Sequence, residues 1–170
     1  MVGKLSPTGA AQTLLSIPTS RPAPYPSVVF VHGSGTPPRQ QFNFWADQFT
    51  RLGFAVLVFD KRGSGSSAGD WREADFTDLA RDVLACVDVL KARSDVDPKQ
   101  IGLFGQSQGG WVAPLAASLS PDIAWLALVS GAPLRLPAKT GGKLSRNFAN
   151  AEFSKATLTA PSHSGNSTTT

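Results

Sequence analysis

The sequence predicts an α/β fold, a three-layer sandwich around a mostly parallel sheet. Four near-continuous apolar runs rich in Val, Leu and Phe occur between residues 27 and 131, as is typical of strands buried on both faces of a parallel sheet. Segments with helical character separate these runs, and alternating strands and helices form parallel sheets through right-handed crossovers. With 170 residues, of which 41% are hydrophobic, the chain has room for one domain with a substantial core.

The expected elements follow one another at short intervals. A weak strand is predicted at residues 12–17, before a proline-rich linker. Stronger strands are predicted at SVVFVH (27–32), FAVLVFD (54–60), IGLFG (101–105) and AWLALVSG (124–131), and helices at 40–52, 77–93 and 108–118. The second helix has the clearest pattern, because Leu79, Val83, Val87 and Leu90 form one apolar stripe between an acidic start and a basic end.

The chain is predicted to divide into a core, residues 1–136, and a tail, residues 137–170. The tail is rich in Lys, Asn, Ser, Thr and Gly and ends in SHSGNSTTT. Such a composition buries too little apolar surface to offset chain entropy, so we expect a flexible tail. The net charge of +4 arises after Gly131 and lacks the aromatic residues and regular spacing of a nucleic-acid surface. We therefore expect a solvated basic tail and no nucleic-acid partner.

Cellular location and cofactors are constrained by what the sequence contains. No apolar run approaches the ~20 residues needed to span a bilayer, and the N-terminal apolar stretch is short and interrupted. The single cysteine, Cys86, has no internal disulfide partner, and two distant histidines with one cysteine form no ligand cluster. We expect a cytoplasmic protein with no membrane partner, no metal and no organic cofactor.

The motif GQSQGG, residues 105–110, lies between the predicted strand at 101–105 and the predicted helix at 108–118. Gly-x-Ser-x-Gly is a weak pattern by itself, and a plain tight turn is the alternative interpretation. At a strand-to-helix junction, however, it predicts a sharp turn that strains the backbone of Ser107 and presents its hydroxyl at a helix N-terminus. Ser107 is therefore the predicted nucleophile.

A second glycine-rich motif, HGSG at residues 32–35, follows the strand at 27–32. The backbone N–H groups of Ser34 and Gln108 are predicted to form an oxyanion hole, which stabilises the substrate's carbonyl oxygen as it gains charge. His32 is an alternative general base. A histidine that closes a buried strand more often orients its loop by hydrogen bonding, so His32 and Gly33 are interpreted as loop scaffold.

A third motif, FDKRGSGSSAGDW at residues 59–71, follows the strand at 54–60. In this order, His-Gly-Ser-Gly, Asp-x-Arg-Gly-x-Gly-x-Ser and Gly-x-Ser-x-Gly resemble the α/β-hydrolase superfamily, particularly its esterases and its serine aminopeptidase or prolyl-oligopeptidase-like members. The resemblance covers residues 25–135 and implies a partial α/β-hydrolase fold, with Asp60 and Arg62 as scaffold of the loops near the site. A phosphate-binding loop is disfavoured, because this stretch lacks the Gly-Lys-Ser/Thr that must follow the glycines. Trp71 lies near the expected substrate mouth and is a candidate pocket residue.

The resemblance also implies an acid and a histidine on two further strands, which this sequence does not visibly contain. After Gly131 the only acid is Glu152 and the only histidine is His163. Their order matches the family's Ser, acid, His, but the short interval between them leaves little room for a strand and a loop. Either Ser107, Glu152 and His163 form a triad, or the last two are solvated tail residues. A truncated or frame-shifted coding sequence, a compact natural variant and completion by a second chain all remain open.

The sequence thus predicts a serine hydrolase that cleaves small-molecule carboxylic esters through an acyl-enzyme on Ser107. The alternatives are a serine peptidase or thioesterase, and a catalytically impaired hydrolase fragment that acts as a binding or interaction module. Without the final strands, the apolar edge of the strand at 124–131 would be exposed, which favours a homo-oligomer formed through that edge.

Overall fold

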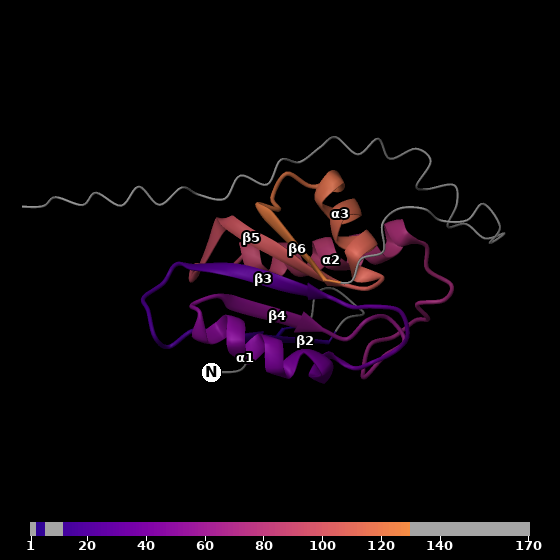
Figure 1. Cartoon of the computed structure of the whole chain (residues 1–170), viewed down its shortest axis with the longest axis horizontal. Coiled ribbons are helices and arrows are strands. Elements are labelled where there is room, and N and C mark those ends of the chain that lie inside the picture. Colours follow the sequence, from indigo (N-terminus) through magenta and orange to yellow (C-terminus); the bar gives the residue numbers. More distant parts are fainter. Residues whose placement is uncertain (1–2, 6–11, 130–170) are drawn as a thin grey trace, which may run out of the picture.

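The computed structural model describes residues 3–5 and 12–129, and the structural statements below concern those residues. A six-stranded sheet in the order β1-β2-β4-β3-β5-β6 forms the middle layer (Figure 1). The strands are β1 (Gly3–Leu5), β2 (Thr13–Ser16), β3 (Tyr25–Val31), β4 (Ala55–Phe59), β5 (Val96–Gln106) and β6 (Trp125–Val129). The helices are α1 (Asn43–Arg51), preceded by the 3-10 turn η1 (Arg39–Phe42), α2 (Phe76–Lys91) and α3 (Gly109–Leu119).

Four of the strands, β4, β3, β5 and β6, run parallel to one another, whereas β2 is antiparallel to β4 and β1 is antiparallel to β2. The α/β fold with a mostly parallel sheet is thus confirmed. Strand β1 is absent from the sequence prediction because three residues are too few for a period-two pattern to emerge.

Strand β5 begins earlier than predicted, at Val96 instead of Ile101. Its first part pairs with the start of β3, where Tyr25 lies opposite Val96 and the register then shifts before Ser27. Pro98, Lys99 and Gln100 of β5 are exposed, and this proline with its two polar neighbours interrupts the apolar run on which the prediction depended.

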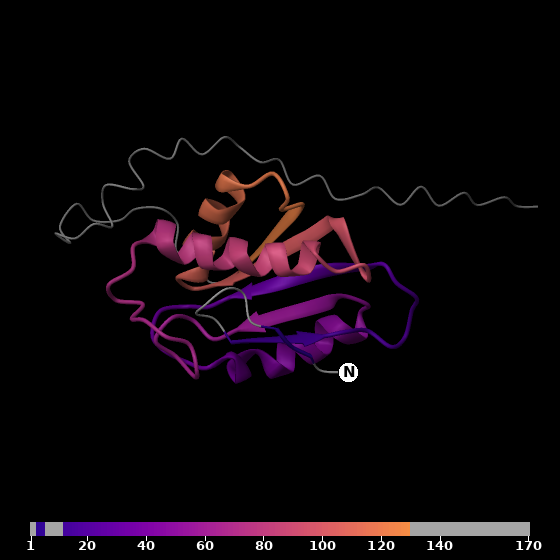
Figure 2. The same cartoon turned by 180° about the vertical axis from the view of Figure 1, so that it is seen from behind.

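The sheet is covered on both faces, with α2 and α3 on one side and α1 on the other (Figures 1 and 2). Alternate residues of each buried strand point to opposite faces. On one face, Val29 and Leu57 pack in a cluster with Val83 of α2 and Val112 of α3. On the other face, the cluster consists of Val28, Phe30, Val56, Val58 and Phe104 against Phe42 and Ala46. These two apolar layers hold the three-layer sandwich together.

Helix α2 begins with a capping box, in which Asp75 accepts a hydrogen bond from the Asp78 N–H and the Asp78 carboxylate accepts one from the Asp75 N–H. This arrangement satisfies two backbone donors at the helix start. Helix α1 differs from the predicted helix at 40–52, because its first turn is the separate 3-10 turn η1; such turns are frequent at helix N-termini.

The three glycine-containing motifs meet at one edge of the sheet. Val31 pairs with Gly105, and Gln106 pairs with Val129, so the carboxyl ends of β3, β5 and β6 lie together, with the end of β4 beside β3. In open α/β sheets, ligands bind at this edge. None of the helices in the described part of the chain combines the length and the apolar character required to cross a bilayer.

Strand β6 forms one edge of the described sheet, and its Leu128 and Val129 are 47% and 42% exposed. Association of two copies through this edge stays a prediction. The predicted core–tail boundary at 136 and the tail at 137–170 lie outside the described residues.

Candidate active site

Ser107 occupies the sharp turn between β5 and α3, and its side chain is exposed. Its φ angle is 52°, and among the described residues it is the only non-glycine residue with a positive φ. The Ser107 N–H donates to the Val129 carbonyl at 3.0 Å, and the Gly110 N–H donates to the Ser107 carbonyl at 2.8 Å. Hydrogen bonds therefore fix the backbone on both sides of Ser107, and such strained conformations persist only where the surrounding structure holds them.

The glycines of Gly-x-Ser-x-Gly allow β3, β5 and α3 to approach closely. A Cβ atom on Gly105 would lie 2.3 Å from the Gly109 carbonyl oxygen, and a Cβ atom on Gly109 would lie 2.2 Å from the Val31 carbonyl oxygen. Side chains do not fit at these distances. The two glycines thus have a packing role at the point where the helix crosses the sheet.

The HGSG loop lies against Ser107. A Cβ atom on Gly33 would lie 3.3 Å from the Ser107 Cβ and 3.8 Å from the Ser107 Oγ. Within residues 12–129, the N–H groups of Ser34 and Gln108 donate no hydrogen bond. Backbone N–H groups without a partner are the donors of which oxyanion holes are made, so these two groups are available for the predicted role.

His32 is buried at the end of β3, and both of its ring nitrogens have partners. Nε2 bonds to the Phe59 carbonyl at 2.5 Å, and Nδ1 bonds to the Gln41 side-chain amide. Since a carbonyl only accepts, Nε2 carries the proton and Nδ1 accepts from the Gln41 Nε2–H. Burial lowers the pKa of His32 to about 4, despite the opposing effect of the Phe59 carbonyl. The ring is neutral at neutral pH and connects β3 to β4 instead of contacting Ser107.

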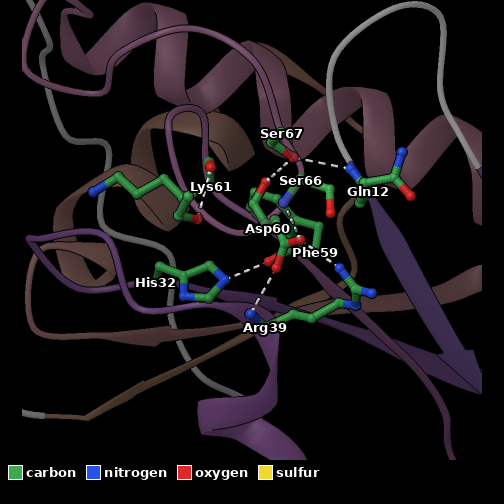
Figure 3. A network of polar contacts seen from close by, with 9 residues as sticks. Gln12, His32, Arg39, Phe59, Asp60, Lys61, Ser66 and Ser67 are labelled. Carbon is green, nitrogen blue, oxygen red and sulfur yellow. Dashed lines mark hydrogen bonds and ion pairs between the residues drawn. The ribbon is translucent and has the colours of Figure 1, made fainter.

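Asp60 lies at the centre of a buried polar network (Figure 3). Its carboxylate accepts hydrogen bonds from the Arg39 N–H at 2.8 Å and the Ser66 N–H at 3.2 Å, and it pairs with the Arg39 guanidinium. Its carbonyl accepts from the Ser67 Oγ at 2.9 Å. A Cβ atom on Gly65, whose φ is +54°, would lie 2.2 Å from Asp60 Oδ2. Asp60 thereby connects its own loop to the first residue of η1.

Arg62 connects the same loop to α2. Its guanidinium donates two hydrogen bonds of 2.7 Å to the Asp82 carboxylate, and these bonds raise the pKa of Arg62 above its ordinary value. The planar guanidinium matches the carboxylate in this two-point geometry. The Arg62 side chain is therefore paired with Asp82 and serves as a connection between this loop and α2.

Lys61, between these two residues, has a role that the sequence analysis missed. Its side chain is almost fully buried, and Nζ donates to the Gly33 carbonyl at 2.9 Å and to the Gln108 Oε1 at 2.5 Å. Nζ also lies 4.3 Å from the centre of the Trp71 ring. Burial lowers the pKa of Lys61 to about 8. The only signal in the sequence is a lysine directly after a strand that is otherwise entirely apolar up to Asp60.

Trp71 is partly buried and packs against the α2–α3 side of the core. Its indole Nε1 is buried without a hydrogen-bond partner among the described residues. A cavity of about 10 Å³ has His32, Lys61 and Gln108 in its wall. That volume holds roughly one water molecule, so this cavity is not a substrate pocket. Whether Trp71 contacts substrate stays a prediction.

The remaining predicted site residues, Glu152 and His163, lie outside the described residues. Within residues 12–129, no side chain makes a hydrogen bond to the Ser107 Oγ. In the same part of the chain, no group of three or more His, Cys, Asp or Glu residues is placed to hold a metal ion. The described site thus consists of the turn at Ser107, the HGSG loop and the Asp60–Arg62 loop.

The sequence is similar to those of known proteins. The quorum-quenching protein AidA of Acinetobacter baumannii is 31% identical over 109 residues, which cover 64% of this chain and 35% of AidA. Thiohydrolase apmlB of Arthrinium phaeospermum is 30% identical over 119 residues, which cover 69% of this chain and 39% of the relative. The chain thus spans little more than a third of the length of these relatives.

Among solved structures, the α/β hydrolase GrgF from Penicillium superposes with a TM-score of 0.65 at 25% identity, over 75% of this chain and 44% of GrgF. The sequence profile described as "Serine aminopeptidase, S33" matches residues 22–167. This match includes all three motifs and most of the chain. The chain therefore belongs to the serine aminopeptidase S33 family of α/β hydrolases.

Proposed function

We propose that the protein is a serine hydrolase that cleaves carboxylic esters of small molecules, with Ser107 as the nucleophile. The observation that carries the proposal is the exposed, left-handed Ser107 between β5 and α3, with the HGSG loop against it. An ordinary turn would place Gly or Asn at a positive φ. A serine in that conformation costs about 1–3 kcal/mol, which favours a functional reason for its presence.

In the proposed reaction, the Ser107 Oγ attacks the ester carbonyl carbon while its proton passes to a general base. The carbonyl oxygen becomes an oxyanion and accepts hydrogen bonds from the N–H groups of Ser34 and Gln108. The intermediate collapses, the C–O bond to the alcohol breaks, and the alcohol leaves with the proton held by the base. Water then attacks the acyl-enzyme, which releases the acid and restores Ser107.

We propose His163 as the base and Glu152 as the group that orients it. The support for this assignment is the chain order, because both residues follow Ser107 in the order that the family uses. Since His32 has both ring nitrogens occupied, it does not compete for this role. The assignment can be tested directly by replacing His163 and Glu152 one at a time.

A thioester is the second candidate substrate class, favoured by the 30% identity to a relative named as a thiohydrolase. Comparing the hydrolysis rates of an ester and a thioester that share one acyl group would distinguish the two candidates. The acyl-enzyme is the same for both, and only the leaving atom, oxygen or sulfur, differs. A peptidase would instead cleave an aminoacyl amide. We also retain a cytoplasmic location as a proposal, on the ground that Cys86 is a free, buried thiol.

The first experiment is labelling with a fluorophosphonate probe, followed by intact mass and peptide mapping. Wild type is compared with Ser107→Ala and with Ser118→Ala, which removes an exposed hydroxyl on α3. Rapid addition of one label, lost only in Ser107→Ala, would support an activated nucleophile. Labelling no faster than for an ordinary serine would favour the alternative of an impaired fragment that binds without catalysis.

The same assay tests the proposed base. His163→Ala and Glu152→Ala are expected to slow labelling and acyl transfer, His163→Ala by about as much as Ser107→Ala slows acyl transfer, because triad members act as a unit. Full activity in both variants would instead assign the base to another group, including one supplied by a second chain.

A further inference from the structure

Lys61 lies at the centre of the candidate site although neither motif chemistry nor chain order assigns it a function. Its side chain extends from the carboxyl end of β4 and contacts two other segments, the HGSG loop and the start of α3. Its exposed fraction is 4%. A buried ammonium group is costly unless hydrogen bonds compensate for the loss of water. A residue that connects two loops at such a cost calls for an explanation.

Each of the two groups that accept a hydrogen bond from Lys61 is close in the chain to one of the proposed oxyanion donors. The Gly33 carbonyl and the Ser34 N–H are parts of one planar peptide group, in which they point in opposite directions. A hydrogen bond that fixes the carbonyl therefore fixes the direction of the N–H. The other acceptor, Oε1 of Gln108, is on the residue whose backbone N–H is the second donor.

We propose that Lys61 is a positioning residue that orients and polarises the two N–H donors of the oxyanion hole. The inference rests on the proposed function, because it assumes that Ser34 and Gln108 stabilise the oxyanion. A cation on the Gly33 carbonyl withdraws electron density from that peptide group and makes the Ser34 N–H a stronger donor. The same cation, itself buried, also favours negative charge on the substrate oxygen.

The charge of Lys61 is not neutralised by a neighbouring carboxylate. Asp60 pairs with Arg39, and Asp82 pairs with Arg62; no described acid forms an ion pair with Lys61. The neutral His32 and the face of the Trp71 ring complete its surroundings, and Arg72 lies farther out, 5.9 Å from that ring. The ammonium group is therefore stabilised by the Gly33 carbonyl, the Gln108 side chain and the indole ring. It loses a proton more readily than an exposed lysine does, because burial lowers its pKa to about 8.

The test compares the rate of fluorophosphonate labelling of Ser107 across pH in wild type, Lys61→Met and Lys61→Arg. Lys99→Met, which removes an exposed lysine on β5, is the matched control. Lys61→Met keeps the buried apolar volume and is expected to lower the labelling rate roughly 10- to 100-fold, somewhat less than the loss of a complete oxyanion donor. Lys61→Arg is expected to recover part of the rate because it keeps the charge.

The pH profile distinguishes positioning from simple structural support. In wild type, the labelling rate should include a decline above about pH 8, where Lys61 loses its proton. That decline should be absent in Lys61→Arg, since arginine stays charged. Equal rates and profiles in wild type and Lys61→Met would overturn the inference. Labelling that is lost in Ser107→Ala but unchanged in Lys61→Met would preserve the proposed function and reject only the role of Lys61.

A second measurement does not depend on an active nucleophile. The backbone amide resonances of Ser34 and Gln108 in ¹⁵N-labelled protein should shift with a common midpoint near pH 8 in wild type and remain constant in Lys61→Arg. If wild type shows no labelling but these resonances titrate together, the proposed function fails and the positioning contact stands. Amide resonances that ignore both the pH step and the Lys61→Met substitution would refute the contact itself.

Discussion

Replacing His32 with glutamine is expected to make the folded state less sensitive to acid. His32 is 2% exposed, and burial lowers its pKa from 6.5 to about 4. The unfolded chain therefore binds a proton at this ring near pH 6.5, whereas the folded protein does not do so until about pH 4. Because the unfolded state holds more protons in this window, the stability due to the neutral ring is present above pH 6.5 and is lost as the pH falls.

The size of the effect follows from the two pKa values. The interval from 6.5 to about 4 corresponds to roughly 3 kcal/mol of unfolding free energy when the pH has fallen below both values. Between about pH 7 and about pH 4.5, the expected loss is about 2 kcal/mol. This is a large share of the ~5–15 kcal/mol that stabilises a typical domain.

Urea unfolding of wild type and His32→Gln, followed by circular dichroism over this pH range, measures the loss. Glutamine keeps a donor for the Phe59 carbonyl and an acceptor for Gln41, but it does not titrate. Carboxylates and His163 are common to both proteins, so their contributions cancel in the difference between the two curves. The variant should lose about 2 kcal/mol less than wild type on acidification. Parallel curves would show that His32 is not held neutral by burial.

Three further predictions concern the frame of the site. Gly109→Ala should lower the unfolding free energy by more than about 1 kcal/mol, because its Cβ would meet the Val31 carbonyl; a thermal unfolding midpoint equal to that of wild type would contradict the close crossing. Cys86 should not react with a thiol reagent such as dithiobisnitrobenzoate in the native protein at neutral pH, since complete burial raises its pKa, and fast native-state reaction would be inconsistent with this. Arg62→Ala and Asp82→Ala should each cost about 1 kcal/mol in urea unfolding, with little added cost in the double variant, because both remove the same pair; strictly additive losses would argue against the contact.

Much of the fold could be predicted because the strands at the centre of the sheet are apolar along their whole length. Residues 55–59 of β4 are all buried, so their sequence contains no polar position that could obscure the strand. The start of β5 could not be predicted in the same way. Pro98, Lys99 and Gln100 are exposed and show no strand pattern. The early start depends on the pairing of Val96 with Tyr25 of β3, which is a long-range contact without a local signal.

In the candidate site, too, the residues in local motifs were predicted from the sequence, whereas the residue with long-range contacts was not. Ser107, Ser34 and Gln108 stand in motifs whose spacing follows from a local turn, so the sequence is sufficient to propose them. The contacts of Lys61 join residues that are 28 and 47 positions apart. Only the sheet order β4-β3-β5 brings these segments together, and a single lysine between Asp60 and Arg62 gives no indication of which loops it reaches.

The positive φ of Ser107 means that stability and the proposed reactivity make opposite demands at one residue. Glycine would adopt this backbone conformation without steric cost, whereas serine carries a penalty of about 1 kcal/mol or more. A sequence optimised for thermal resistance alone would therefore replace the hydroxyl, and laboratory selection for heat tolerance without selection for turnover should drift toward glycine at this position. The serine in this turn lowers the stability of the folded state, and the packing of the rest of the sheet must offset that loss.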